Sequence, residues 1–144
     1  MGQKGALHTA DFKRLAAFRY ALRRFLFFSE MAAKRVGLTG QHYQAMLVIR
    51  SRAGRVPVTI NDFARELLIR HNSAVGLVDR LVAHSLVVRE RNPQDRREVR
   101  LRLTATGEKV LGRLASAHRI KLRRIGPQIY KNLSALTGAW SRDR

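Results

Sequence analysis

The sequence predicts a mainly helical fold with one small β-hairpin, because its hydrophobic period changes within residues 69–104. Residues 71–84 carry apolar side chains at the spacing of one helix face, namely Ala74, Leu77, Val78 and Leu81. Residues 99–103 alternate instead, with Val99, Leu101 and Leu103 between arginines, and the polar stretch 92–97 separates them from an earlier short run. A short helix followed by a hairpin with a basic tip is the order of an α+β winged helix-turn-helix, with residues 71–84 as recognition helix and 87–103 as wing.

A long amphipathic helix is expected at residues 9–37. Thr9 is a candidate N-cap, and Gly37 is a candidate left-handed stop. The apolar positions recur at spacings of three and four: Phe12, Leu15, Phe18 (or Arg19), Leu22, Phe25 and Leu26. A helix that packs on the outside of a monomer does not need so much apolar surface. This surface therefore forms either part of the core of this chain or, as the short chain favours, a dimer interface.

Two shorter helices precede the recognition helix. Thr39 is a candidate N-cap of the first, which is expected to end near Ala53. Residues 56–58 are an extended link, and Thr59 with Asp62 matches a capping box, in which each side chain satisfies an amide of the other residue. The second helix should turn these residues inward: Ile60, Phe63, Ala64, Leu67 and Leu68.

After the hairpin, Thr104 is expected to cap another long amphipathic helix. Gly126 and Pro127 predict a break, followed by a last amphipathic segment that ends at Ala139. The domain organisation is therefore a helical dimerisation region, residues 9–37 and 104–139, around a winged helix-turn-helix of residues 38–103.

Basic residues greatly outnumber acidic ones, since 29 Lys and Arg against 10 Asp and Glu give a net charge of +19. The excess is spread along the chain, so electrostatics favours an acidic partner, with double-stranded DNA first. Two rivals stay open. One is a non-specific architectural protein of the nucleoid, and the other is a basic protein associated with membrane or RNA.

Several classes are disfavoured by what the sequence lacks. No apolar run approaches the roughly 20 residues of a transmembrane helix, and the N-terminus has no signal-peptide core, so a cytoplasmic protein is expected. There is no cysteine, and no two of the five histidines share a helical ligand spacing, so no metal is expected. Without a nucleophile elbow, a P-loop or paired carboxylates in an apolar stretch, we expect no enzyme and no cofactor.

At this point the sequence resembles the MarR family of bacterial and archaeal transcription regulators. The resemblance rests on three strings in the family's order and spacing: Val78-Asp79-Arg80-Leu81, Asp95-x-Arg97, and Leu103-Thr104-x-x-Gly107. It implies a homodimer with interlocked terminal helices that holds two winged modules on a pseudo-palindromic site. The expected function is a sequence-specific transcriptional regulator, a repressor that responds to a ligand.

The recognition-helix residues nearest the bases depart from the family's usual pattern: Arg70, His71, Asn72, Ser73 and Gly76. Arg70 can take guanine or a phosphate, and Asn72 can pair with adenine, whereas His71 and Ser73 suit phosphate or base edges. Gly76 lies on the outer face and allows close approach of DNA, unless it is merely tolerated. The alternative for the polar residues is that they are solvated residues at a helix start.

At the hairpin tip, Arg97 is expected in the minor groove, with Asp95 orienting it. The alternative is a surface ion pair of little energetic weight. Three other basic residues are candidates for phosphate contacts: Arg91, Arg96 and Arg100.

Many relatives bind a small aromatic or anionic effector between the dimer helices and the winged module. By that resemblance, the candidate lining residues are Phe25, Phe28, His42 and Tyr43. Aromatic residues at these spacings also fit a plain core. If the pocket exists, the effector favours a spacing of the two recognition helices that misses the half-sites.

Overall fold

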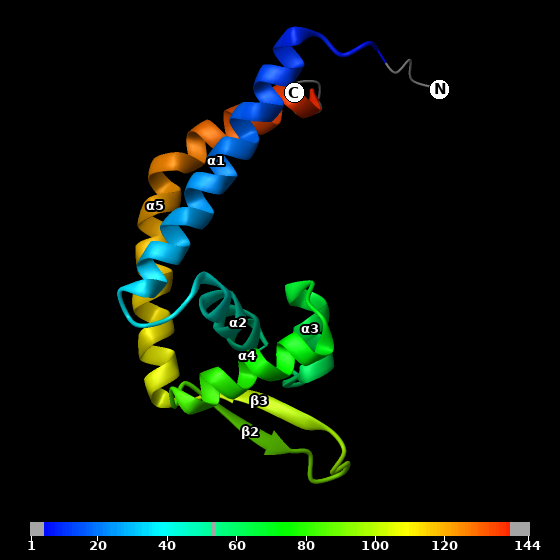
Figure 1. The fold of residues 1–144 in the computed structure, drawn as a ribbon, viewed down its shortest axis with the longest axis vertical. Coiled ribbons are helices and arrows are strands. Elements are labelled where there is room, and N and C mark those ends of the chain that lie inside the picture. Colours follow the sequence, from blue (N-terminus) through cyan, green and yellow to red (C-terminus); the bar gives the residue numbers. More distant parts are fainter. Residues whose placement is uncertain (1–4, 53, 139–144) are drawn as a thin grey trace. The chain divides into compact units, whose positions relative to one another are not determined.

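The computed structural model describes residues 5–52 and 54–138, and it confirms the mainly helical fold with a small sheet. The described chain forms two compact units, one of residues 29–117 and one that joins residues 5–28 to 118–138. The elements follow in this order (Figure 1): α1 (Thr9–Lys34), α2 (Gly40–Ser51), β1 (Val58–Thr59), α3 (Ile60–Leu67), α4 (His71–Ala83), β2 (Val87–Arg91), β3 (Val99–Leu103) and α5 (Ala105–Thr137).

The unit of residues 29–117 contains the predicted winged module and extends into both long helices. Ala33 near the end of α1 is fully buried, and Leu111 and Leu114 on α5 are each 4% exposed. The predicted boundaries of the winged module, residues 37 and 104, coincide with turns. The core of this unit, however, includes about one further turn of α1 and about three turns of α5. The predicted end at Ala139 lies outside the described residues.

The predicted hairpin forms, with β2 antiparallel to β3 and Val87 opposite Leu103. A third strand was not predicted, because residues 56–58 were expected to be only a link. β1 pairs antiparallel with β3, with Val58 opposite Leu101, and the strand order is β1-β3-β2. The sheet therefore ties the start of α3 to the base of the wing.

The core of this unit lies between the sheet and α2, α3 and α4. The predicted inner face of α4 is confirmed, since Ala74, Val78 and Leu81 are fully buried and Leu77 is 1% exposed. The largest fully buried side chains come from all of these elements: Met46, Phe63, Leu77, Leu81, Leu101, Val58, Val78 and Val87. Burying a side chain of this size contributes about 1.5–3 kcal/mol, so α4 is held against the sheet by its apolar face.

Two of the predicted capping residues, Thr39 and Thr59, are each the N-cap of a helix. The Thr59 hydroxyl accepts the Asp62 amide at 3.2 Å, and the Asp62 carboxylate accepts the Thr59 amide at 3.2 Å. The inward placement of Leu68 was wrong. Leu68 ends α3 in a left-handed conformation with φ of 56° and is 91% exposed. The helix has already turned at this position, so its periodicity no longer applies.

The junction of α4, β2 and α5 explains why glycine stands at position 107. Ser85 turns the chain with φ of 58°, and the Thr104 amide donates to the Leu86 carbonyl at 3.0 Å. The Thr104 hydroxyl accepts the Gly107 amide at 2.9 Å, which confirms the predicted cap. A Cβ at position 107 would lie 2.1 Å from the Leu86 oxygen, so no larger residue fits there.

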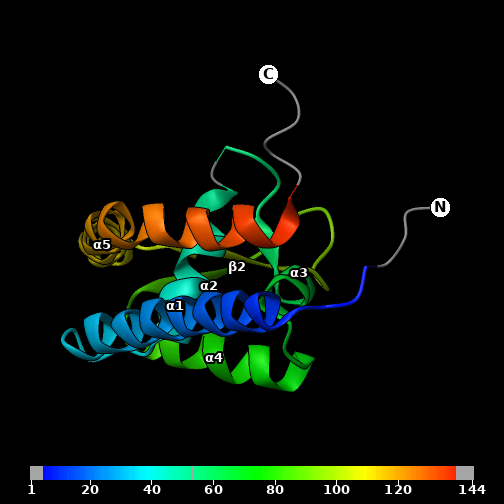
Figure 2. The same ribbon diagram turned by 90° about the horizontal axis from the view of Figure 1, so that it is seen from above.

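The second unit consists of the stretch of α1 up to Phe28 and the stretch of α5 from His118, which run along each other (Figures 1 and 2). The break predicted at Pro127 was wrong, because α5 continues through it. Proline removes one backbone donor, but the usual clash with the preceding side chain is absent because that residue is Gly126. α1 begins at Thr9, one residue before the predicted first helical position, and the Asp11 carboxylate accepts the His8 amide at 2.9 Å.

Candidate nucleic-acid interface

The first turn of α4 presents the predicted polar residues to solvent. Arg70 precedes the helix in an extended conformation, and its side chain makes no capping hydrogen bond. Asn72 and Ser73 are exposed, whereas the next residue, Ala74, is fully buried. The apolar face thus fixes the rotation of α4 about its axis and leaves Arg70, Asn72 and Ser73 outward.

His71 has a partner that the sequence did not reveal. Its Nδ1 lies 3.0 Å from the side-chain oxygen of Asn61, at the start of α3. An amide oxygen only accepts, so Nδ1 is the donor in this contact. Asn61 therefore sets which hydrogen bonds His71 can offer. The signal in the sequence was slight: an asparagine two residues after the cap Thr59.

Gly76 is not required by the protein's own packing. A Cβ there would lie 3.6 Å from a terminal nitrogen of Arg80, which is ordinary van der Waals contact. Arg80 folds back along α4, and its Nε donates to the Gly76 carbonyl at 3.3 Å. Asp79 pairs with Arg89 of β2. The side chains of Asp79 and Arg80 thus contact the protein itself.

The wing tip is shaped by side chains that bind the backbone. Asn92, which is 6% exposed, accepts the Gln94 amide at 3.0 Å and donates to the Glu98 carboxylate at 3.1 Å. Asp95 accepts the backbone amide of Arg97 at 3.1 Å. Asp95 thus orients Arg97 through the turn, and the described residues contain no ion pair between their side chains.

The remaining basic candidates differ in availability. Arg91 and Arg96 are exposed, and the described part of the chain contains no ion pair to either. Arg100 is half-buried, and its Nε donates to Glu98 at 3.3 Å. Arg100 is therefore already engaged and is the weakest of the predicted phosphate contacts.

A hollow of about 450 Å³ brings the recognition helix and the wing together. It is lined by Asn61 and His71 on one side and by Asp95, Arg97 and Glu98 on the other. Three of the predicted DNA contacts, His71, Asp95 and Arg97, therefore share one concave surface, although His71 and Asp95 are 24 positions apart in the chain.

The predicted effector residues fall in different units. Phe25 and Phe28 lie in the two-helix unit, where their rings meet His118 edge to face at 5.8 and 5.3 Å. His42 and Tyr43 are buried in α2. That these four residues line one cleft stays a prediction.

His42 has a structural task that the sequence interpretation missed. Its Nδ1 accepts the Thr39 amide at 3.0 Å and so completes the cap of α2. Burial lowers the pKa of His42, and the charges of Arg80 and His84 lower it further, whereas Glu30 acts in the opposite direction. Burial also raises the pKa of Tyr43. Both side chains are consequently held neutral near pH 7.

The pKa of Asp62 is lowered, although its partial burial acts to raise it. Burial is the largest single effect, but the hydrogen bonds from Thr59 and the charges of Arg65 and Arg52 together outweigh it. The carboxylate that caps α3 is therefore stably ionised.

Neither a metal centre nor a membrane span is found in residues 5–52 and 54–138. The described part of the chain contains no cluster of three or more histidines or acidic residues able to hold a metal ion. Of its helices, none is both long and apolar enough to cross a membrane.

Comparison with known families identifies the module. A model of the MarR family matches residues 36–98, which span α2, α3, α4 and most of the wing. Residues 36–98 are therefore similar to the MarR family. This match agrees with the resemblance seen in the sequence.

Solved MarR-family structures share the fold over nearly the whole chain. AbsC, a MarR family transcriptional regulator from Streptomyces coelicolor, is 20% identical, with 96% of this chain and 94% of AbsC covered and a TM-score of 0.76. A mutant of MepR from S. aureus bound to an oligodeoxyribonucleotide is 18% identical, with coverage of 85% and 94% and a TM-score of 0.67. A mutant of MarR from E. coli complexed with operator DNA is also 18% identical, with coverage of 91% and 86% and a TM-score of 0.61. No curated protein matches the sequence significantly.

Proposed function

We propose that this chain is a sequence-specific DNA-binding transcriptional regulator. The observation that carries the proposal is the shared concave surface of α4 and the wing, which joins His71 to Arg97. In this proposal the first turn of α4 enters the major groove and the wing tip enters the adjacent minor groove. The MarR-family module and the DNA bound by the related MepR and MarR mutants support this assignment.

The residues divide into base readers and backbone contacts. Asn72 is proposed to pair with adenine, and Arg70 with guanine or a phosphate, because both are exposed at the start of the helix. Arg97 is proposed to sit in a narrow, electronegative minor groove, with Arg91 and Arg96 on phosphates.

We propose that the functional form is a homodimer on a pseudo-palindromic site. The two-helix unit exposes large apolar side chains that a monomer would leave in water: Phe12 at 58%, Tyr20 at 63%, Leu26 at 61%, Phe27 at 66% and Ile120 at 54%. Patches of this kind mark interfaces. A second copy that covers them would place two winged modules on half-sites about one DNA turn apart.

Repression and control by a small aromatic or anionic effector complete the proposal. The support is the family of the module together with the aromatic side chains of Phe25, Phe28 and Tyr43. In this scheme the effector shifts the population of dimers toward a spacing of the recognition helices that does not match the half-sites.

Selection of bound sites from a random duplex pool tests the function. The expected result is a conserved pseudo-palindrome with half-sites about 10 base pairs apart. If excess random duplex displaces the selected site as readily as the site displaces itself, the chain is a non-specific nucleoid protein, a reading that the net charge of +19 also permits. Failure to bind duplex DNA near physiological salt, with binding to liposomes or RNA, would contradict both.

Two substitutions separate readout from charge. Arg97→Ala should weaken binding strongly and relax the preference for A·T pairs modestly, whereas Asn72→Ala should change the preference at one base position per half-site. Arg113→Ala is a matched control for lost charge, because Arg113 is exposed on α5, outside the predicted interface. Equal, sequence-independent losses from Arg97→Ala and Asn72→Ala would reduce the proposed readout to phosphate binding.

A further inference from the structure

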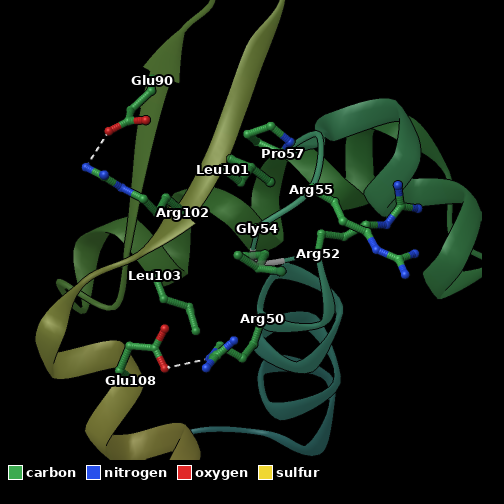
Figure 3. A pocket seen from close by; sticks show the side chains of 11 residues that line it. Arg50, Arg52, Gly54, Arg55, Pro57, Glu90, Leu101, Arg102, Leu103 and Glu108 are labelled. Atoms are coloured by element: carbon green, nitrogen blue, oxygen red, sulfur yellow. Dashed lines mark hydrogen bonds and ion pairs between the residues drawn. The ribbon is translucent and has the colours of Figure 1, made fainter.

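A second concave site lies in the winged module, among residues that the proposed DNA interface does not use. This pocket of about 280 Å³ is formed by the end of α2, the link to β1, the sheet and the first turn of α5 (Figure 3). All of its lining residues belong to the unit of residues 29–117. Its size suits a ligand at or below the small end of the usual range.

The interior of the pocket is aliphatic. Ile49, Leu101 and Leu103 line it, and these three side chains are 6%, 2% and 8% exposed. Pro57 adds a further apolar surface from the link. These side chains offer no hydrogen bond to a bound molecule, so an apolar body fits here better than a polar one.

Four arginines and two glutamates also line this pocket, and Figure 3 shows the side chains of Arg52 and Arg55 directed away from Leu101 and Leu103. Figure 3 shows Arg102 paired with Glu90 on the strands and Arg50 paired with Glu108 at 3.1 Å. Arg52 also has a carboxylate partner, which lies outside the pocket, in α3. The fourth is Arg55, an exposed residue for which the described residues provide no acidic partner.

We propose that this pocket binds a small organic anion in which an oxyanion head is joined to an aliphatic body. The body lies against Ile49, Leu101 and Leu103, and the exposed side chain of Arg55 turns from the position drawn in Figure 3 to give the head a charge-assisted hydrogen bond. Arg102 contributes only in competition with Glu90, which already neutralises it. The net positive charge of the lining favours an anionic ligand, and the apolar interior favours a ligand with an aliphatic body.

A matched series of three probes tests the chemistry on the full-length chain without DNA. Acetate supplies the head alone, 1-pentanol supplies the tail alone, and pentanoate supplies both. Binding is followed by NMR through the methyl groups of Leu101 and Leu103 and the amide of Gly54, all of which line the pocket. We expect pentanoate to shift these signals and to bind about tenfold or more tightly than either fragment. Equal binding of 1-pentanol would overturn the role of the arginines, and equal binding of acetate would overturn the role of the aliphatic interior.

Charge variants test the proposed contacts in opposite directions. Arg55→Gln should weaken pentanoate binding about tenfold, because it removes the charged donor. Glu90→Gln should strengthen binding several-fold, since it releases Arg102. The pair that it breaks has side chains 68% and 45% exposed, so folding should be unaffected. Arg113→Gln, which removes a charge from α5 outside the pocket, should leave binding unchanged.

The outcomes are independent of the proposed DNA function, because no measurement involves DNA. If pentanoate shifts signals elsewhere but not those of Leu101, Leu103 and Gly54, the proposed site is wrong. If Arg113→Gln weakens binding as much as Arg55→Gln, the anion is attracted by the overall charge, and a built site is contradicted.

Discussion

Gly76 and Gly112 make a matched pair for the idea that DNA approaches the backbone of α4 closely. Glycine inside a helix costs about 1 kcal/mol relative to alanine. A Cβ at Gly76 meets only a terminal nitrogen of Arg80 at 3.6 Å, and a Cβ at Gly112 meets nothing within 4 Å. No contact in the protein offsets the gain in helix propensity when alanine replaces either glycine. Each alanine variant should therefore raise the free energy of unfolding by about 0.5–1 kcal/mol, or the melting temperature by roughly 2–4 °C.

The two variants should differ only on DNA. Gly76 lies on the outer side of the recognition helix, so an added methyl group there should hold the helix away from the groove and weaken operator binding on the order of tenfold, about 1.4 kcal/mol. Gly112 lies on α5, and Gly112→Ala should leave DNA binding unchanged. Gly107→Ala is the opposite control: its Cβ would lie 2.1 Å from the Leu86 oxygen, so overpacking should destabilise the fold by about 1–3 kcal/mol.

Denaturant unfolding and DNA titration of the same three preparations check these values. The close-approach reasoning is refuted if Gly76→Ala gains stability but binds the selected operator as tightly as the unchanged chain. The packing reasoning is refuted if Gly76→Ala loses stability while Gly112→Ala gains it, because the two glycines would then differ in a protein contact that the structure does not contain.

Three further predictions follow from hydrogen bonds in the winged module. Because the pKa of buried His42 is lowered, the unfolded chain takes up the proton first as the pH falls through about 6.5. Stability measured by denaturant should therefore fall from pH 7 down to the lowered pKa of the folded state, and His42→Gln, which still accepts the Thr39 amide, should flatten this slope. Asn61→Asp still accepts the hydrogen on Nδ1 of His71, so in a site selection it should keep the base preference next to His71. Asn61→Leu should lose this preference while its melting temperature is unchanged. If both variants select the same bases, Asn61 has no role in readout. Asp95→Asn, which can still accept the Arg97 amide, should bind DNA at least as well as the unchanged chain, and Asp95→Ala should bind several-fold more weakly; a similar loss in both would restore an ionic role for Asp95.

The sequence predicted the features that depend on neighbouring residues. Thr39, Thr59 and Thr104 cap helices because the unpaired amides of a first turn lie within reach of a hydroxyl three residues earlier. The buried face of α4 was likewise predicted from the spacing of its apolar residues, because residues three and four positions apart lie on the same side of a helix. These contacts are determined by geometry over one turn, and the sequence displays that geometry directly.

The features that were missed join residues distant in the chain or override a local rule. β1 has only two residues, and its pairing partner Leu101 is 43 positions from Val58. Asn61 and His71 are ten residues apart on different helices, so nothing in their spacing indicates a hydrogen bond. At Pro127 the local rule gave the wrong answer, because it took Gly126 as a second helix breaker, whereas the missing side chain of Gly126 removes one of the clashes that proline causes.

The distribution of ion pairs explains why a chain with few acidic residues still presents free positive charge at one place. Glu108, Glu66 and Glu90 each pair with an arginine that is not among the predicted DNA contacts. By contrast, the turns that position His71 and Arg97 use the amide of Asn61 and the backbone bond of Asp95, which leave the arginine side chains unneutralised. Within the described residues, no ion pair involves Arg70, Arg96 or Arg97. The turns at the proposed interface are thus held by hydrogen bonds that do not neutralise the arginine side chains. These positive charges are therefore free to contact the phosphate backbone of DNA.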